Sequence, residues 1–130
     1  MMQSVDELRK IVWENLKDCQ VVFLATVDGD QPRVRPVTLM RKDNNLFTVS
    51  MLKNAKVDQI RKNPKAEFAF SIPDIGFNAI RVECTAEVID DEKIRVEIYN
   101  SPEHALIKLA PTKFTVLIPP SLEVATFSPI

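Results

Sequence analysis

The sequence predicts a mainly antiparallel β structure of six or seven strands, with short helices at its edges. Short runs of β-branched and aromatic residues recur along the chain, turn residues separate them, and only a few segments have the spacing of an amphipathic helix. Antiparallel sheets of this size commonly close into a barrel, which removes their exposed edges. The 130 residues fit a single domain over 1–130.

Helices are expected where apolar residues recur every three or four positions behind a capping residue. Ser4 and Glu7 form a capping box before the first such stretch, and Asn54 can cap the second. Beyond a third stretch, Ser101-Pro102 supplies the N-cap and first-turn residues of a further helix. The expected helices span residues 5–18, 55–62, 90–100 and a short segment from 101.

Strands are expected in the apolar, β-rich runs between turn residues. Asp28-Gly29 tolerates positive φ, which predicts a hairpin after the first run. Pro36 lies in the second run and cannot donate to a ladder, so that strand is an edge strand or is interrupted by a ligand. The expected strands span residues 21–27, 32–40, 46–51, 66–72, 77–89, 114–119 and 122–127.

Residue counts exclude several classes of protein. Average usage would give about nine glycines, but the chain has two, so no glycine-rich phosphate loop can be written and side chains must hold any phosphorylated ligand. His104 is the one histidine and falls in the last expected helix; we assign it no role and expect no metal site. Cys19 and Cys84 lack a C-x-x-C pattern, and no signal peptide or membrane-length apolar run is found, which predicts a cytoplasmic protein with reduced thiols.

The charge is unevenly distributed. Residues 33–65 carry nine basic and two acidic side chains, a net charge of +7, whereas the whole chain has a net charge of −1. Such a segment is either a solvated basic face or a local anion site. Nucleic acid is not expected as a partner, because Phe47 is the one aromatic residue of the segment and the protein is not basic overall.

Four segments give the chain a resemblance to a known family when their order and spacing are taken together. They are Leu24–Val37, Leu46–Ser50, Lys56–Pro64 and Ile80–Val88. The sequence resembles the FMN-binding split-barrel proteins of the pyridoxamine 5′-phosphate oxidase-like family, from about residue 4 to residue 127. The resemblance implies a six- to seven-stranded antiparallel split β-barrel with short peripheral helices.

The resemblance also implies FMN as the cofactor and a set of cofactor-binding residues. Those along the flavin ring and ribityl chain, and those at its phosphate, would be Arg35, Pro36, Val37, Val49, Ser50, Asn54 and Lys56. Taken singly, Arg35, Ser50 and Lys56 are ordinary surface residues. A phosphate is nevertheless stabilised by a helix N-terminus and by charge-assisted hydrogen bonds to Arg and Lys, which agrees with the phosphate-binding roles that the resemblance implies.

Two positions depart from the family pattern. Relatives often carry a hydroxyl or an arginine just before the lysine, whereas this chain has Asn54-Ala55-Lys56, so one phosphate ligand is missing or is replaced by Asn54 or Lys53. Cys84 stands where relatives frequently have glycine, and we expect a small buried side chain there instead of a nucleophile.

The function that the resemblance implies is an FMN-dependent oxidoreductase acting on an unidentified small molecule. It would be a homodimer with the flavin at the subunit interface. No catalytic side chain can be assigned, and the C-terminal region that contacts pyridoxal phosphate in the true oxidase has no counterpart here, so pyridoxamine phosphate oxidation is not expected. The alternatives are a non-catalytic protein that holds FMN, a deazaflavin or haem as carrier or sensor, and a structural dimer with an empty cleft.

Overall fold

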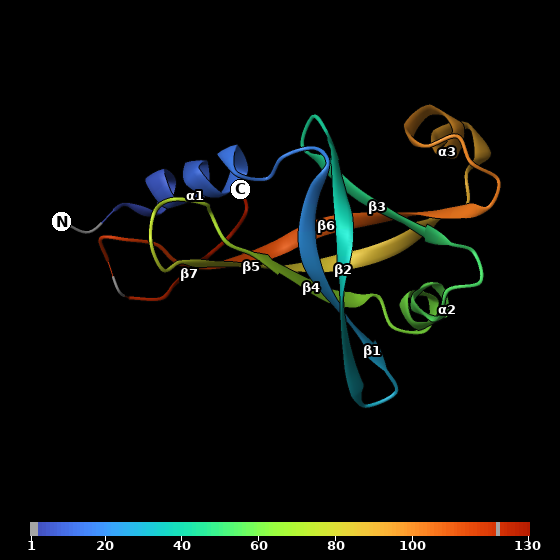
Figure 1. Ribbon diagram of the computed structural model, residues 1–130, viewed down its shortest axis with the longest axis horizontal. Coiled ribbons are helices and arrows are strands. Elements are labelled where there is room, and N and C mark those ends of the chain that lie inside the picture. The colour runs from blue at the N-terminus through green and yellow to red at the C-terminus, as the bar shows by residue number, and fades with distance from the viewer. Residues whose placement is uncertain (1–2, 122) are drawn as a thin grey trace.

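The computed structural model describes residues 3–121 and 123–130, and its strands form a barrel with three short helices around it (Figure 1). The helices are α1 (Val5–Glu14), α2 (Ala55–Lys62) and α3 (Glu92–Ile98). The strands are β1 (Gln20–Asp28), β2 (Gln31–Lys42), β3 (Asn45–Met51), β4 (Lys65–Phe70), β5 (Ala79–Ile89), β6 (His104–Leu117) and β7 (Ala125–Phe127). Among the described residues, no helix is long and apolar enough to cross a membrane.

The barrel is closed by a pairing between strands that are distant in the sheet order. The order is β3-β2-β1-β4-β5-β6-β7, and β3 also pairs with β6. That ladder runs antiparallel from Leu46 opposite Leu109 to Met51 opposite His104. Strands β1 to β6 therefore form the barrel and β7 extends it, which confirms the expected antiparallel split barrel with short peripheral helices.

Strands β2 and β3 part soon after the turn that joins them. β2 pairs with β1 from Gln31 to Leu39, but its register with β3 covers only residues 40–42. Beyond that point one side chain bridges the two strands, because the Thr48 hydroxyl donates to the Thr38 carbonyl oxygen at 2.8 Å. We call the space flanked by residues 31–39 of β2 and 48–51 of β3 the β2–β3 opening. Pro36 lies on this free edge of β2, where its missing N–H leaves no ladder bond unmade.

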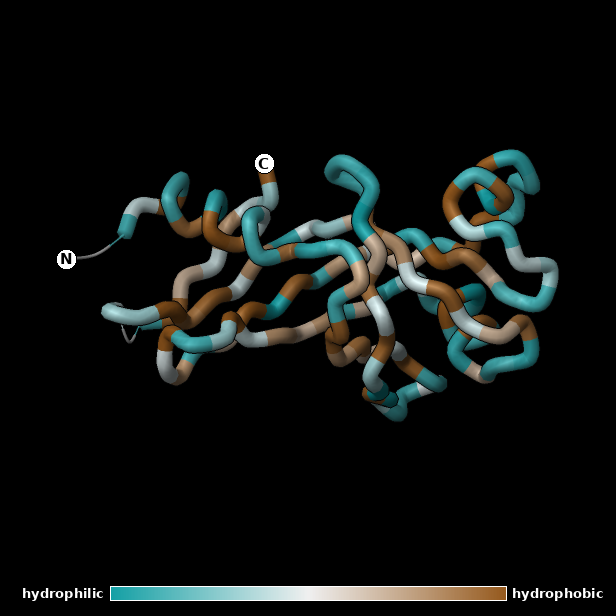
Figure 2. Tube along the Cα trace, turned by 45° about the horizontal axis from the view of Figure 1, so that its top comes forward, coloured by the Kyte–Doolittle hydropathy of each residue, from teal (hydrophilic) through white to brown (hydrophobic). Residues whose placement is uncertain are grey.

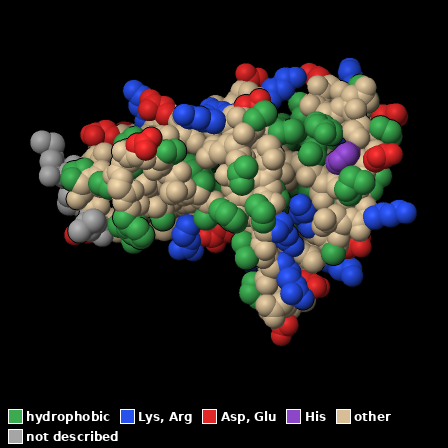
Figure 3. Space-filling view, viewed as in Figure 1, with side chains coloured by type: hydrophobic (Ala, Val, Ile, Leu, Met, Phe, Trp, Pro, Cys, Tyr) green, Lys and Arg blue, Asp and Glu red, His purple; other side chains and the backbone are tan. Residues whose placement is uncertain are grey.

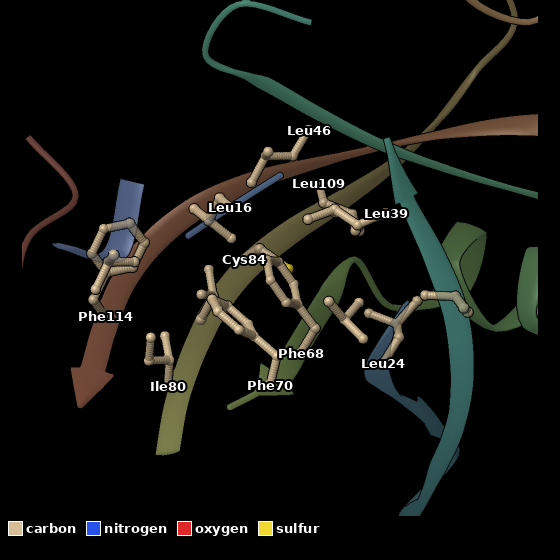
Figure 4. Close-up of a cluster of buried hydrophobic side chains, with 14 of the residues drawn as sticks. Leu16, Leu24, Leu39, Leu46, Phe68, Phe70, Ile80, Cys84, Leu109 and Phe114 are labelled. Carbon is tan, nitrogen blue, oxygen red and sulfur yellow. The ribbon is translucent and has the colours of Figure 1, made fainter. Parts of the chain in front are cut away.

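The core lies inside the barrel, where large side chains from several strands point toward one another (Figure 4). Phe68 and Phe114 are fully buried, and burial of one such side chain stabilises the fold by about 1.5–3 kcal/mol. Cys84 is also in this cluster, at a register shift of β5. Burial, and secondarily the charge of Glu67, raises the pKa of its thiol to about 12. The thiol therefore stays protonated near neutral pH, and Cys84 is a small core residue as expected.

Hydropathy along the chain follows this arrangement. Hydrophobic stretches run along the central strands, and hydrophilic residues gather at the hairpin turns (Figure 2). The turn between β1 and β2 contains Gly29 with φ of +64°, the left-handed conformation that the Asp28-Gly29 pair predicts.

Helix α1 begins as predicted and ends earlier than predicted. The backbone N–H of Glu7 donates to the Ser4 hydroxyl oxygen at 3.1 Å, as the capping box requires. The helix was expected to reach residue 18, but its last residue is Glu14. Asn15 ends it, because its side-chain amide donates to the Ile11 carbonyl oxygen at 2.8 Å and competes with the next helical turn.

Helix α2 has the bounds that the sequence predicts, residues 55–62. The Asn54 side-chain oxygen accepts a hydrogen bond from the backbone N–H of Lys56 at 2.9 Å, which is the expected N-cap. Val57 and Ile60 are buried and anchor the helix against the barrel. The helix therefore holds the residues of its first turn close to the ends of β1 and β5.

The prediction of a helix from residue 101 is wrong, and so is the placement of His104 in that helix. Residues 101–103 form a turn, and β6 begins at His104, ten residues before the strand expected from residue 114. The segment 104–109 has good helix formers, but it pairs with β3 on one side and its later part with β5 on the other, and this tertiary pairing outweighs local propensity. Of the final strand expected over 122–127, β7 covers Ala125–Phe127, and residue 122 lies outside the described residues.

Candidate functional site

A hydrogen-bonded network at the α2 end of the barrel joins β1, β2 and α2. The Arg35 guanidinium donates to the Thr26 hydroxyl at 2.6 Å and to the Gln59 side-chain oxygen at 3.0 Å. The Thr26 hydroxyl in turn donates to the same Gln59 oxygen at 2.7 Å. Two backbone carbonyls, of Leu24 and Arg33, complete the acceptors of Arg35 at 3.4 and 3.3 Å. Every acceptor of this guanidinium is therefore electrically neutral.

Lys56 is the second cation of this end of the barrel. It lies in the first turn of α2 and is only 6% exposed. Within the described residues its ammonium group has no hydrogen-bond acceptor and no carboxylate within 4 Å. Burial lowers the pKa of Lys56, and the nearby charge of Arg35 lowers it further. The Lys56 side chain is buried, but its ammonium group is not among the fully buried polar atoms without a partner, so it keeps some contact with solvent. A partly desolvated cation without a carboxylate partner favours a bound anion.

Arg35 also has a positively charged neighbour, Arg33. Burial and the charge of Arg33 lower the pKa of Arg35. Basic side chains are visible along the side of the β1–β2 hairpin that faces α2 (Figure 3). Arg33 itself has a carboxylate partner, Asp28, at 3.8 Å. Arg35 and Lys56 have none among the described residues, and they form what we call the cation pair.

Two other basic residues of the 33–65 segment pair with carboxylates. Arg61 contacts Asp90 at 3.0 Å and Lys42 contacts Glu97 at 3.2 Å, both at the surface. The hydrogen bond from Arg61 is the main reason that the pKa of Asp90 is lowered. Three of the nine basic residues, Arg33, Lys42 and Arg61, thus form ion pairs at the surface, whereas Arg35 and Lys56 have no carboxylate partner among the described residues.

The other predicted cofactor-binding residues occupy different environments around the β2–β3 opening. Ser50 is buried on β3, and its hydroxyl has no hydrogen-bond partner among the described residues. Val49 precedes it and is half-buried, and Pro36 is exposed on the free edge of β2. Val37 points into the core cluster, so only its backbone faces the opening. Asn54 uses its side-chain oxygen for the N-cap and keeps only its NH₂ group for a ligand.

Thr26 and Gln59 are residues of this site that the sequence did not indicate. They are 1% and 9% exposed, respectively, and both contact Arg35 directly. A threonine in a strand and a glutamine in a short helix are common surface residues, and no local pattern marks either. One signal was present in the sequence, because Gln59 follows Lys56 by three positions and therefore lies on the same side of α2.

Two hollows lie near these residues. One, of about 450 Å³, lies between the turn of the β1–β2 hairpin and α2, and Gln59 and Lys62 are among its lining residues. The other, of about 410 Å³, follows the end of β3 and is lined by Met51, Leu52 and Lys53 with the 102–103 turn. Among the described residues, no group of three His, Cys, Asp or Glu side chains could hold a metal ion.

His104 is placed at the end of the β3–β6 ladder, opposite Met51. Its Nδ1 atom lies 2.7 Å from the Ser101 hydroxyl oxygen, and its ring meets that of Tyr99 edge to face at 5.5 Å between centroids. These contacts fix the 101–104 turn. No contact joins His104 to the cation pair.

The comparison with known families decides the identity of the fold. The family model described as Pyridoxamine 5′-phosphate oxidase matches residues 8–117, which include every strand except β7. The chain belongs to the pyridoxamine 5′-phosphate oxidase family. No protein of curated function matches its sequence.

Solved structures agree with this family assignment. A NimC/NimA family protein from Clostridium acetobutylicum has 26% sequence identity and a TM-score of 0.69, with 92% of each chain covered. General stress protein 26 from Bacillus anthracis has 20% identity and a TM-score of 0.73, covering 93% of this chain and 99% of that one. The second similarity shows the fold alone.

Two further structures with the same fold have names that refer to other cofactors. An F420 reductase has 21% identity and a TM-score of 0.62, covering 78% of this chain and 93% of that chain. A haem-binding protein from Mycobacterium smegmatis has 11% identity and a TM-score of 0.71, and this chain spans 60% of its length. Membership of the pyridoxamine 5′-phosphate oxidase family therefore leaves the cofactor to be argued from the site.

Proposed function

We propose that this protein binds FMN at the β2–β3 opening and acts as an FMN-dependent oxidoreductase on a small molecule. The observation that carries the proposal is the cation pair, two partly desolvated cations with no carboxylate partner among the described residues. A phosphate monoester with a charge near −2 would neutralise both. Lys56 also lies in the first turn of α2, where the helix dipole favours an anion.

The residues around the cation pair suit the rest of a flavin mononucleotide. At Arg35–Val37, β2 pairs with β1 but not with β3, so the backbone groups that point away from β1 are open to a cofactor, and the unpartnered Ser50 hydroxyl can bond to the ribityl chain. Val49 and Pro36 supply apolar surface for the ring. Ala55 cannot replace the hydroxyl or arginine that relatives often have before the lysine, so the cation pair would carry most of the phosphate contact.

The flavin, when bound, supplies hydride or electron transfer, and the protein supplies binding, orientation and electrostatics. The chain's own part in the proposed reaction is to fix the phosphate with Arg35 and Lys56, which orients the rest of the cofactor along the opening. This division fits a site in which no side chain has been assigned as acid, base or nucleophile.

We also propose that the protein is a homodimer with the flavin at the subunit interface. Its support is an apolar outer face over β1 and β2, where Val21, Phe23 and Val34 are 62%, 54% and 70% exposed. These residues share one side of paired strands, since Phe23 lies opposite Pro36 and Ala25 opposite Val34. Adjacent exposed apolar side chains commonly mark an association surface. Sedimentation velocity of the purified protein would give the mass of a dimer, and a monomer at micromolar concentration would contradict this part.

The experiment that tests the cofactor assignment is a set of titrations on the full chain. The protein as purified is examined for flavin absorbance, and the apo form is titrated with FMN, F420 and haemin by calorimetry. Tight binding of FMN alone supports the proposal. Binding of F420 or haemin in preference to FMN would support the second candidate, a protein that holds a deazaflavin or haem, and the absence of binding to all three would contradict both.

Turnover then separates an enzyme from a carrier or sensor. The FMN-loaded protein is incubated with NADH or NADPH and an artificial electron acceptor, and the oxidation of the nucleotide is followed. Reduction and reoxidation of the bound flavin over many cycles supports an oxidoreductase. A flavin that binds tightly but is not reduced by either nucleotide would favour the non-catalytic alternative.

A further inference from the structure

Thr26 and Gln59 hold Arg35 in a way that leaves its charge uncompensated. The two side chains and two backbone carbonyls accept the hydrogen bonds of Nη1 and Nη2, Nε makes none among the described residues, and none of these acceptors is ionised. Arg81 has a different environment on β5, where it contacts the Glu67 carboxylate at 2.6 Å. A carboxylate in place of Gln59 would fix Arg35 just as well, but it would neutralise the charge.

The amide of Gln59 has a defined orientation. Its oxygen accepts from both Arg35 and Thr26, so its NH₂ group must point away from the guanidinium. Thr26 donates its only proton to Gln59, so its hydroxyl oxygen is left to accept from Arg35. The directions of the three hydrogen bonds are mutually consistent, and reversing any one would set two donors or two acceptors against each other.

Gln59 also links the two cations mechanically. It lies three positions after Lys56 on the same helix, and it bonds to Arg35 on β2. Together with the buried Val57 and Ile60, this side chain ties α2 to the barrel and so helps to fix Lys56 relative to Arg35. Gln59 is only 9% exposed and Thr26 1%, so neither position is freely variable surface.

We propose that Thr26 and Gln59 are positioning residues that orient Arg35 for a phosphate monoester without neutralising its charge, and that this network, more than contacts to the flavin ring, sets the preference for FMN over riboflavin. The inference rests on the proposed function. A half-buried arginine held only by neutral groups near a second cation is suited to an anion of charge near −2, and a carboxylate at position 59 would remove that suitability.

The test compares FMN, riboflavin and inorganic phosphate on the full chain and its variants. Gln59→Glu keeps the acceptor oxygen and adds a charge, Gln59→Met removes the acceptor, and Thr26→Ser keeps the hydroxyl. Gln20→Glu is the matched control, because Gln20 lies at the start of β1 and bonds only to the backbone N–H of Lys17. Dissociation constants are measured by calorimetry, and stabilisation by phosphate is measured as a shift in Tm.

We expect Gln59→Glu and Gln59→Met to lower the affinity for FMN about ten- to a hundredfold, the range for one charge-assisted hydrogen bond. Affinity for riboflavin should be unchanged in both. The Tm of ligand-free Gln59→Glu should be equal to or above that of the parent chain, because the new carboxylate pairs with Arg35, and a purely structural role would not separate Tm from affinity in this way. Thr26→Ser and Gln20→Glu should behave like the parent chain.

A double-mutant cycle shows whether Gln59 acts through Arg35. In an Arg35→Met background, Gln59→Met should cause no further loss of FMN affinity. Equal losses in both backgrounds, or FMN affinity that is unchanged by all Gln59 variants, would overturn the inference while leaving FMN binding intact. If the parent chain binds no FMN but is stabilised by phosphate in a Gln59-dependent way, the flavin proposal fails and the network stands as an anion site. If neither ligand binds, both fail.

Discussion

The two ends of β2 each carry an arginine, and the two arginines face opposite electrostatic surroundings. Arg41 donates to the backbone oxygens of Trp13 and Leu16 at the carboxyl end of α1, and its guanidinium lies 5.2 Å from the centre of the Trp13 ring. That end of a helix carries a partial negative charge of about one half. Arg35 is also held by neutral oxygens, but its charged neighbours are Arg33 and Lys56.

Under the proposed function, one residue type would serve stability at one position and binding at another. Arg41 lies in the short section where β2 and β3 pair, and its charge is compensated by the helix end and the indole ring. Arg35 lies six residues away, where the strands have parted, and has no carboxylate partner among the described residues. Electrostatic surroundings therefore distinguish the two positions better than hydrogen-bond number does, since both guanidiniums donate several hydrogen bonds.

The largest effect should follow from removing the cation pair. Arg35→Ala together with Lys56→Ala should weaken FMN binding about 10²- to 10⁴-fold, as two contacts worth about ten- to a hundredfold each, and Lys56→Ala alone should account for one such factor. The fold should remain, because Thr26 and Gln59 still bond to each other. Calorimetric titration with FMN measures the loss. Lys65→Ala, an exposed lysine of the same basic segment, is the control, and unchanged FMN affinity in the double variant would show that the pair is no phosphate site.

At the other end of β2 the effect should appear in stability instead. Arg41→Ala removes the hydrogen bonds to the α1 carbonyls and the contact with Trp13, so the free energy of unfolding should fall by about 2–3 kcal/mol. Denaturant unfolding of the ligand-free protein measures this change, and the FMN dissociation constant should not move. Arg61→Ala breaks only an exposed ion pair with Asp90 and should lower the free energy of unfolding much less. A similar loss in both variants would show that the helix-end contacts of Arg41 have no special value.

The smallest effect is the contribution of Lys56 to the pH dependence of stability. Its pKa is lowered by burial and by Arg35, so the folded chain releases this proton at a lower pH than the unfolded chain does. Between the lowered value and the ordinary 10.5, the unfolded state binds more protons, and this contribution to the free energy of unfolding rises with pH. Cys84, whose pKa is raised from 9.0 to about 12, acts in the opposite direction, so the rise is measured by denaturant unfolding as the difference between the ligand-free parent chain and Lys56→Met at increasing alkaline pH. Identical slopes would mean that Lys56 is fully hydrated in solution.

Local signals predicted the elements that local chemistry determines. Asn54 and the Asn63-Pro64 pair bound α2, and the helix has the expected limits. The Asp28-Gly29 turn and Pro36 likewise identified the β1–β2 hairpin and the free edge of β2. In each case the residue acts on its own backbone or on that of its neighbours, so the sequence carries the information within a few positions.

Features that depend on distant partners could not be predicted in this way. The start of β6 at His104 is determined by pairing with β3 and β5, which outweighs the helix formers of residues 104–109. Thr26 and Gln59 become part of the site only because the barrel brings β1 and α2 to Arg35. The basic segment left a solvated face and an anion site as alternatives. The different surroundings of Arg35 and Arg41 follow from the elements that pack around each, which the local sequence does not reveal.

The parting of β2 and β3 has a consequence for how this molecule can change over evolutionary time or in the laboratory. The ladder that closes the barrel runs between β3 and β6 and includes Val49 and Ser50, whereas the β2 residues that border the opening lie outside it. Under the proposed function, substitutions at positions such as 35, 36 and 56 would therefore alter which molecule is held while the ring of strands keeps its register. Ligand recognition and barrel closure would then depend on different residues. A library of variants confined to these positions should retain a high proportion of folded members.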